Sequence, residues 1–513
     1  MDKSPTKAQT SAEGATPEHP ATGVAQASSS SSSKPKLFLY ERMEGAIHPD
    51  DSEPRLHNYV YISSEKKLPG STSNLPGLSK IFIKLCDYFV HFRKRKNNDY
   101  INYLDLRDVT VTTGKIKAKD RFDVVQNFPS HLYVLNFRAG DERYEVYFDF
   151  EEIYQIWVQA TRRFATFKDF DSEYKLIENK QPGFRHKITA YEKEALCIRN
   201  GDTLNPPLGV QVFPTSLVAA TKRIERYIKT ELDALKELAL SENASNLMQL
   251  HGSFLTEQEV KIVFTDFPGV NLRERLAKAP THRLDHRESL ETMLRIARGV
   301  YSMHQKKLGH LNLHPEVVRF MDPDEDYSFE LAIFNLGFST RMPAAARSMT
   351  GILGFAAPEL MFPDKMEFTD ATKPINYSAD VFSLGVMLYV MILGVLPFKG
   401  KTPEEIFAEV KAGALNIANP LTEVGCPKQI SSLVASCLAF APESRIQTVR
   451  AFLAHDAFKL LDFPSDLTQS GNTPKLEGQL TLEDAYSLTL ALESYAWLRD
   501  YSTHLQKHYG SAK

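Results

Sequence analysis

Residues 80–148 alternate short apolar runs with polar breaks, a pattern that predicts β-strands joined by turns. Lys80–Leu85 and Tyr88–Phe92 are separated by the polar pair Cys86-Asp87, which indicates a hairpin turn. Further strands are expected at Ile101–Val111, Leu132–Phe137 and Arg143–Phe148. The segment therefore predicts a β-rich domain built mainly from neighbouring hairpins.

The spacing of apolar residues changes directly after these strands. Ile153, Ile156, Trp157 and Ala160 recur at helical spacing, which predicts one amphipathic helix that closes the β-rich segment. Asp149, with a glutamate three residues later, fits the N-terminal cap of this helix.

Both ends of the chain differ from the middle. Residues 1–36 are rich in Ser, Ala, Thr, Pro and Gln and hold almost no large apolar side chains, so we expect a disordered leader. Residues 463–513 read as a polar linker followed by a helix with apolar residues on one side. That helix either packs on the preceding domain or docks elsewhere.

Composition narrows the class of protein. A chain of 513 residues should hold two or three domains, because single cores seldom grow past about 250 residues. The net charge of -3 gives the whole chain no pull toward nucleic acid. The 4 cysteines stand far apart, which argues against a disulfide framework or a metal site and fits a reducing compartment. With no apolar run long enough to span a bilayer and no signal pattern, we expect a cytoplasmic protein.

The β-rich segment resembles a pleckstrin-homology (PH) domain. The most specific stretch, YVLNFRAGDERYEVYFDFEEIYQIWVQA, is similar to the last strands and capping helix of that family, with Trp157 at the position of the tryptophan that plugs the barrel. The resemblance covers most of residues 57–167 and implies a PH-like β-barrel with a C-terminal capping helix at residues 37–167.

PH domains that bind phosphoinositides hold the phosphates with basic residues on the first two strands. The matching candidates here are Lys66, Lys67, Lys80 and Lys84. The family's basic pattern is incomplete, because Phe82 lies two residues after Lys80. Two readings stay open: this domain docks on a phosphoinositide membrane surface, or it docks on a protein.

Residues 170–462 resemble a protein kinase. The apolar stretch Ser383–Gly400 is similar to the αF helix, Ala356–Leu360 to the A-P-E motif, and Ala441–Arg445 to the late arginine motif. Thr230–Ala239 is similar to the αC helix. The resemblance implies an α+β multidomain chain in which a bilobal protein-kinase-like fold follows the PH-like barrel.

The resemblance also implies structural roles for particular residues. Glu231 falls at the αC glutamate, Asp380 at the αF aspartate that anchors the catalytic loop, and Glu359 and Arg445 at a buried ion pair. The positions of the apolar regulatory spine are taken by Leu235, Leu250, His310 and Leu336.

The catalytic loop has the outline of the family without its reactive groups. Leu308–Phe320 reads LGHLNLHPEVVRF, where kinases have H-R-D-L-K-P-E-N. Asn312 stands where an aspartate accepts the substrate proton, and Val317 stands where an asparagine holds Mg²⁺. An amide is not a base and valine is not a metal ligand. His314 is the one candidate for a replacement base.

The phosphate-binding positions are altered in the same way. Only Gly183 lies in the stretch expected to form the glycine-rich loop, so the backbone cannot wrap phosphates closely. Gln211 replaces the lysine of the third strand, and Asn335 replaces the metal-binding aspartate. Arg319 falls on the floor of the adenine pocket and Phe264 at its gatekeeper position. We therefore expect an occluded pocket, with no cofactor and no metal.

These observations favour a pseudokinase that works as a scaffold or allosteric regulator in signalling. The expected partner is a protein, either an active kinase or a cytoskeletal protein, and not a nucleic acid. Two alternatives remain: a divergent active Ser/Thr protein kinase, and a membrane adaptor that acts mainly through the PH-like domain at the periphery of a membrane or the cytoskeleton.

Overall fold

The computed structural model describes the following residues: 56–64, 79–93, 100–122, 129–177, 193–202, 204–241, 244–321, 330–344, 351–362, 374–413 and 420–462. The expected leader and C-terminal helix, Lys66, Lys67 and Gly183 lie outside them. The contacts of the chain group Leu37–Lys513 as one unit, separate from Met1–Lys36.

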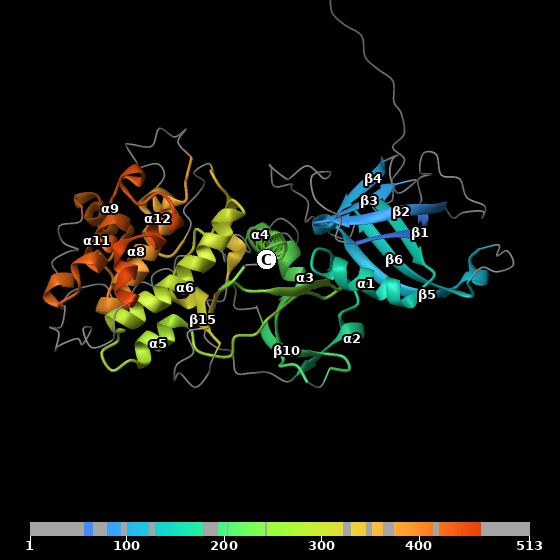
Figure 1. The fold of residues 1–513 in the computed structure, drawn as a ribbon, viewed down its shortest axis with the longest axis horizontal. Coiled ribbons are helices and arrows are strands. Elements are labelled where there is room, and N and C mark those ends of the chain that lie inside the picture. Colours follow the sequence, from blue (N-terminus) through green and yellow to red (C-terminus); the bar gives the residue numbers. More distant parts are fainter. Residues whose placement is uncertain are drawn as a thin grey trace, which may run out of the picture. The chain divides into compact units, whose positions relative to one another are not determined.

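The first part of the larger unit is an antiparallel β-structure of strands β1–β7, drawn in blue to blue-green in Figure 1. The strands are β1 (Leu56–Ser64), β2 (Ser79–Cys86), β3 (Phe89–Arg93), β4 (Tyr100–Asp105), β5 (Thr110–Lys117), β6 (His131–Ala139) and β7 (Glu142–Phe148). The pairs are β1–β2, β2–β3 and β3–β4 on one side and β5–β6 and β6–β7 on the other, and β1 also pairs with β7. The order of neighbours is thus β4-β3-β2-β1-β7-β6-β5.

Two details of this part differ from the expectations. The stretch Ile101–Val111 is not one strand, because a 3-10 turn at Leu106–Asp108 separates β4 from β5, and the Asp105 side chain accepts a hydrogen bond from the Arg107 amide at its start. The expected hairpin between β2 and β3 is present, with its turn at Asp87 in the left-handed region (φ 50°).

Helix α1 (Glu151–Arg162) follows β7, as its apolar spacing predicts. Trp157 on this helix is fully buried, and its indole Nε1 donates a hydrogen bond to Asn58 Oδ1 on β1 at 2.9 Å. The helix thereby ties the last strand of the sheet back to the first. The expected cap at Asp149 is wrong: the N-cap residue is Phe150, whose side chain makes no capping hydrogen bond.

The next strands form a second antiparallel sheet. They are β9 (Tyr174–Ile177), β10 (Lys193–Arg199), β11 (Leu208–Pro214), β12 (Leu250–Leu255) and β13 (Glu259–Phe264), in the order β9-β10-β11-β13-β12. Helices α3 (Thr215–Ala220) and α4 (Lys222–Leu238) connect β11 to β12. Helix α4 has an amphipathic sequence and buries one side, as expected for αC.

A two-residue strand joins the two sheets. Strand β8 (Thr166–Phe167) pairs in parallel with β5 on one side and with β12 on the other. The result is one thirteen-stranded sheet and a shared apolar core, to which Trp157 contributes from α1 and Val263 from β13. The two parts that the sequence presents as separate domains are therefore continuous through backbone hydrogen bonds.

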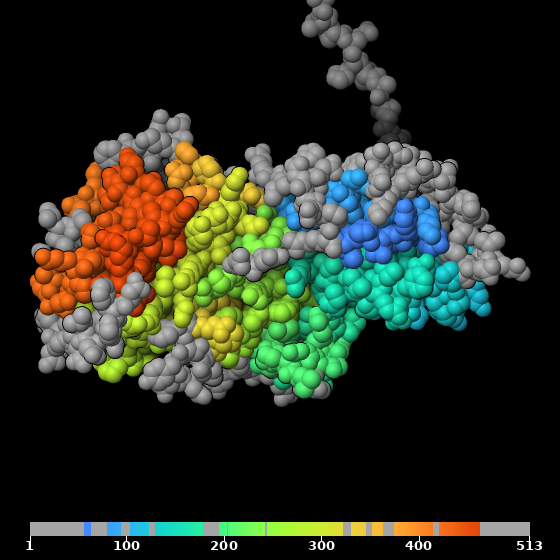
Figure 2. All heavy atoms as spheres, viewed as in Figure 1, coloured from blue at the N-terminus to red at the C-terminus, as the bar shows by residue number. Residues whose placement is uncertain are grey.

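The rest of the described chain is mainly helical (Figure 1). Figure 2 shows the surface of this part, coloured from yellow-green to red. Its helices are α5 (Leu272–Lys278), α6 (His286–Gln305), α7 (Pro358–Met361), α8 (Ser378–Leu393), α9 (Pro403–Ala412), α11 (Lys428–Cys437) and α12 (Val449–Leu453). All 16 residues of α8 are buried, and α6 and α11 pack against it. Gly394 ends α8 in the left-handed conformation (φ 74°). A sheet lobe followed by a helical lobe fits the bilobal kinase fold.

Short β-strands and turns line the region between sheet lobe and helical lobe. They are β14 (Leu308–Gly309), the 3-10 turn Pro315–Val317, β15 (Val318–Phe320), β16 (Leu331–Ile333), the 3-10 turn Leu336–Phe338 and β17 (Thr340–Arg341). Strand β14 pairs with β17, and β15 with β16. Val317 lies on one of these segments, Asn312, His314 and Asn335 lie between them, and Gln211 lies apart on β11.

Candidate active-site cleft

Asp380 on α8 accepts hydrogen bonds from the backbone of the segment that contains the catalytic-loop motif. One carboxylate oxygen accepts the His310 amide and the other accepts the Leu311 amide, each at 2.8 Å. His304 on α6 lies 2.9 Å from the same carboxylate. Burial is the largest single influence and would raise the pKa of Asp380, but the hydrogen bond and charge of His304, the electrostatic contribution of His310 and the Leu311 amide together hold that pKa below its usual range. This anchor permits the left-handed backbone of Leu311 (φ 60°).

His310 has a structural role in the geometry. Its ring is fully buried, with Nε2 3.2 Å from the Phe334 carbonyl and Nδ1 accepting the Asn312 amide at 3.2 Å. Because Nδ1 accepts, the proton resides on Nε2 and is donated to the carbonyl. Burial lowers the pKa of His310, so the ring is neutral and serves as a bridge between the two segments of the cleft.

The positions that would carry out chemistry are all buried. Asn312 is 4% exposed, and His314 and Val317 are 0% exposed. Asn335 is 4% exposed and adopts the left-handed conformation (φ 61°), which asparagine tolerates better than most residues. Asn312, Val317 and Asn335 carry no carboxylate, so none of these three can supply the anionic proton acceptor or metal ligand that the family has there.

The αC glutamate contacts the segment that follows Asn335. Glu231 on α4 is fully buried, and its carboxylate accepts the Leu336 amide at 3.3 Å. Gln211 on β11 is fully buried as well and is a neutral amide. The structure thus places α4 against the metal-binding tripeptide position without a lysine on the third strand.

Aromatic side chains pack together where the resemblance to protein kinases would place the adenine pocket. The rings of Phe264 and Phe267 both meet Phe334 edge-on, at centroid distances of 5.8 and 5.7 Å. The Phe264 ring also lies directly over Gly209, where a Cβ would approach to within 2.3 Å of it. Arg319 is 8% exposed, and its guanidinium lies 5.9 Å from the Phe334 ring. These contacts place Phe334 between the gatekeeper-position ring of Phe264 and the guanidinium of Arg319.

The helical lobe retains a buried ion pair. Arg445 donates two hydrogen bonds to Glu359, at 2.6 and 2.8 Å, and also donates to the carbonyls of Ala439 and Phe440. The pair expected from the motifs at Ala356–Leu360 and Ala441–Arg445 is therefore present.

Comparison with known proteins agrees with this arrangement. The model of the protein kinase domain matches residues 214–458. This part of the chain is a protein kinase domain. The matched region includes the catalytic-loop segment, Asp380 and the Glu359–Arg445 pair.

Curated relatives of the kinase domain are calcium-regulated kinases by name. The chain is 24% identical over 206 residues to "Calcium/calmodulin-dependent protein kinase type II" of Caenorhabditis elegans, which covers 40% of this chain and 27% of the relative. It is 26% identical over 246 residues to "Calcium-dependent protein kinase 25" of Arabidopsis thaliana, which covers 47% of this chain and 44% of the relative. The match to "Calcium/calmodulin-dependent protein kinase cmkA" of Emericella nidulans is 26% over 217 residues, 42% of this chain and 48% of the relative. The chain thus spans less than half the length of each of these relatives.

The described lysine candidates lie on β2, outside the kinase domain. Lys80 and Lys84 lie on the same side of the strand, with Phe82 between them. Phe82 is 5% exposed because Tyr59 and His57 pack on it at 5.1 and 5.6 Å between ring centroids. The structure therefore separates the two lysines by an aromatic cluster and does not bring them together into one basic pocket.

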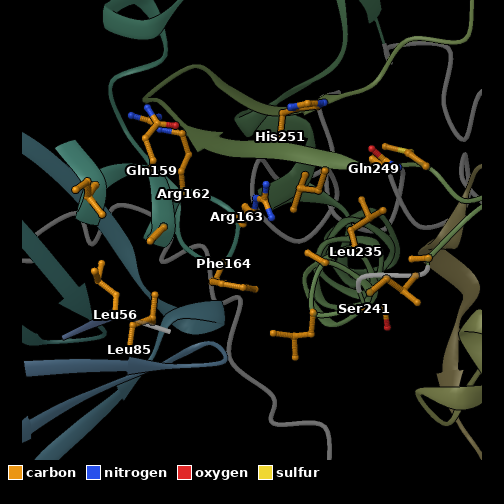
Figure 3. A pocket seen from close by; sticks show the side chains of 18 of the residues that line it. Leu56, Leu85, Gln159, Arg162, Arg163, Phe164, Leu235, Ser241, Gln249 and His251 are labelled. Atoms are coloured by element: carbon orange, nitrogen blue, oxygen red, sulfur yellow. The ribbon is translucent and has the colours of Figure 1, made fainter. Parts of the chain in front are cut away.

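A cavity of about 1230 Å³ opens away from the catalytic segments. Arg162, Arg163 and Phe164 line one side, and Leu235 and Ser241 at the end of α4 line the other (Figure 3). None of its described lining residues belongs to the catalytic loop or to the segment after Asn335. In the described residues no helix is long and apolar enough to cross a membrane, and no cluster of His, Cys, Asp or Glu is placed to hold a metal ion.

Two residues that contribute to the site were not predicted from the sequence. Phe334 directly precedes Asn335, and its bulk at that position was a visible signal for a filled adenine site. His304 lies six residues before His310 on a separate helix, and nothing in the spacing of α6 indicates its bond to Asp380.

Proposed function

We propose that this protein is a pseudokinase that acts as a scaffold or allosteric regulator in signalling. The observation that supports the proposal most strongly is the packing of Phe264 and Phe267 against Phe334, at the place where the family binds adenine. A nucleotide could enter only if these buried rings moved.

The chemistry of the described cleft supports the same proposal. Phosphoryl transfer depends on positioning and on neutralising the charge of the triphosphate, which requires cations and metal ligands. Gln211, Asn312, Val317 and Asn335 are uncharged and occupy the positions at which the family has a lysine, two acids and a metal-binding amide.

The framework of the fold is retained where the chemistry is altered. Asp380 still holds the catalytic-loop backbone, Glu231 still contacts Leu336, and Arg445 still pairs with Glu359. Loss of one partner from a buried pair costs about 3–5 kcal/mol. Retention of these contacts is what a protein needs if its kinase-shaped surface is the functional part.

We propose that the β-rich part is a PH-like domain used for docking on a protein. The strand order, the closing pair β1–β7 and the buried Trp157 on α1 support the PH-like reading. The aromatic cluster between Lys80 and Lys84 favours protein docking over a phosphoinositide pocket. The expected partner is an active kinase or a cytoskeletal protein, and the four buried cysteines, none of them in a disulfide, agree with a cytoplasmic location.

A phosphotransfer assay on the full chain tests the proposal. With ATP and Mg²⁺ or Mn²⁺, we expect no phosphate incorporation into the chain or a peptide library above that of heat-denatured protein. Asn335→Ala and His314→Ala should leave this result unchanged. Robust transfer that either substitution abolishes would replace the pseudokinase proposal with that of a divergent active kinase.

A further inference from the structure

Strands β1–β7 and helix α1, called the barrel here, meet the kinase domain along a contact region around β8, which we call the seam. At its centre, the Thr166 amide donates to the Val109 carbonyl at 3.0 Å and the Lys168 amide to the Val111 carbonyl at 3.1 Å. On the other side, the hydroxyls of Thr166 and Ser253 are 3.1 Å apart, and both residues are at most 3% exposed. Strand β12 of the kinase sheet is thus covered by a strand that belongs equally to the barrel.

A second contact runs from the barrel to the C-terminal end of α4. Arg107 lies in the 3-10 turn between β4 and β5, and Asp105 fixes its guanidinium through hydrogen bonds of 3.0 and 2.7 Å. The same guanidinium stacks over Tyr88 at 3.8 Å and donates to Glu237 on α4 at 3.2 Å. The side chains of Arg107 and Glu237 are 10% and 6% exposed, so water screens this pair only weakly.

Glu237 also holds the segment that follows Asn335. The same oxygen, Oε2, accepts a hydrogen bond from Arg341 on β17 at 3.1 Å. Strand β17 pairs with β14, which directly precedes His310. One carboxylate on α4 therefore joins the barrel, through Arg107, to the strand pair beside the catalytic loop, through Arg341.

The neighbouring residue on α4 reinforces this connection. Lys236 is 1% exposed, and its Nζ donates to the Arg107 carbonyl at 3.2 Å and to Thr166 Oγ1 at 3.4 Å. A buried ammonium group is retained only where acceptors surround it, and two of its acceptors belong to the barrel side of the seam. Helix α4 is thus bound at its end by the barrel and in its middle by the Leu336 amide.

We propose that the α4–β12 surface of the kinase domain is an interaction surface whose partner is the chain's own barrel. Arg107, Glu237 and Arg341 form the clamp that couples the barrel to the position of α4 and of β17. A ligand that displaces the barrel therefore also releases α4 and β17. The inference concerns coupling between parts of the fold and stands whether or not the cleft transfers phosphate.

Hydrogen exchange on the full chain tests the clamp, with Arg107→Ala as the perturbation. Loss of a hydrogen bond to a charged group changes an opening equilibrium by about tenfold or more. We expect amides at the end of α4 and in β17 to exchange at least about tenfold faster than in the wild type. The matched control is Arg121→Ala, which removes a pair with Glu145 inside the barrel, with Arg121 45% exposed. This control should leave α4 within about twofold of the wild type.

Two further variants keep the test decisive. If Arg107→Ala does not fold, Glu237→Gln keeps the shape of the side chain, removes its charge and should give the same pattern of faster exchange in β17 and in the turn around Arg107. Arg107→Lys retains the charge without the fork and should give an intermediate effect. Faster exchange confined to the barrel strands, with α4 and β17 at wild-type rates in both Arg107→Ala and Glu237→Gln, would overturn the proposal.

Discussion

Replacement of Phe334 by alanine tests whether its ring fills the cleft as a packed part of the core. The side chain is 2% exposed and meets the rings of Phe264 and Phe267 edge-on. Full burial of a phenylalanine contributes about 1.5–3 kcal/mol, and each favourable ring pair adds about 0.5–1.5 kcal/mol. With the cavity that remains after truncation, we expect Phe334→Ala to cost about 3–5 kcal/mol.

Urea denaturation of the full chain measures this cost. We expect the midpoint to fall while the slope with urea stays unchanged, because the surface exposed on unfolding is nearly the same. The matched control is Phe150→Ala, since Phe150 is 58% exposed and should contribute less than about 0.5 kcal/mol. A decrease of less than about 1 kcal/mol in the free energy of unfolding of Phe334→Ala would refute the reasoning, because truncation of a fully packed ring costs more than that.

Ligands then distinguish an opened cavity from a nucleotide site. The truncated ring leaves an apolar space, so a small planar apolar compound such as indole should recover part of the lost stability. ATP with Mg²⁺ should not, because Gln211 and Asn335 remain uncharged. Stabilisation of Phe334→Ala by ATP with Mg²⁺ would show that the cleft can still bind phosphate once the Phe334 ring is removed.

Three further predictions concern stability and docking. Arg445→Ala leaves a buried carboxylate without its partner and should lower the free energy of unfolding by about 3–5 kcal/mol, against less than about 0.5 kcal/mol for the exposed Arg450→Ala; equal effects in urea melts would contradict this. Burial raises the pKa of Asp233 from 3.8 to about 6, so the folded state holds this proton more tightly and stability should fall by about 2 kcal/mol as the pH rises from about 4 to about 6. Asp233→Asn should remove that part of the pH dependence of melting, and an unchanged profile would refute the assignment. Lys80→Glu with Lys84→Glu should leave flotation with phosphoinositide-containing vesicles unchanged, whereas charge-dependent loss of flotation would favour the membrane-adaptor alternative.

Much of the fold follows from local pattern in the sequence. The alternation in Lys80–Leu85 and Tyr88–Phe92 identified a real hairpin, and the helical spacing around Trp157 identified α1. The predicted ends of these elements were less accurate, because caps depend on backbone geometry. The N-cap of α1 is Phe150 and not Asp149.

The seam between barrel and kinase domain could not be found in this way. Strand β8 has two residues, too few for any periodicity to appear. Arg107 and Glu237 are 130 positions apart, and each lies among other charged residues that are ordinary on a protein surface. Only the folded chain brings them together, so the predicted division at residues 167–170 carried no sign of the hydrogen bonds that cross it.

Some features of the candidate site could also be predicted from the sequence and others could not. Substituted positions such as Asn312 and Val317 were readable because a motif fixes where each residue type belongs. The occupation of the adenine space by Phe334 depends on which way a ring turns and what packs on it, and this is a property of the three-dimensional arrangement.

Calorimetric titration of the full chain with ATP and Mg²⁺ tests the central claim most directly. The filled adenine site and the uncharged phosphate positions predict no saturable heat, that is, a dissociation constant weaker than about 1 mM. A saturable, stoichiometric binding isotherm in the micromolar range, lost on substitution of Asn335 by alanine, would contradict the account.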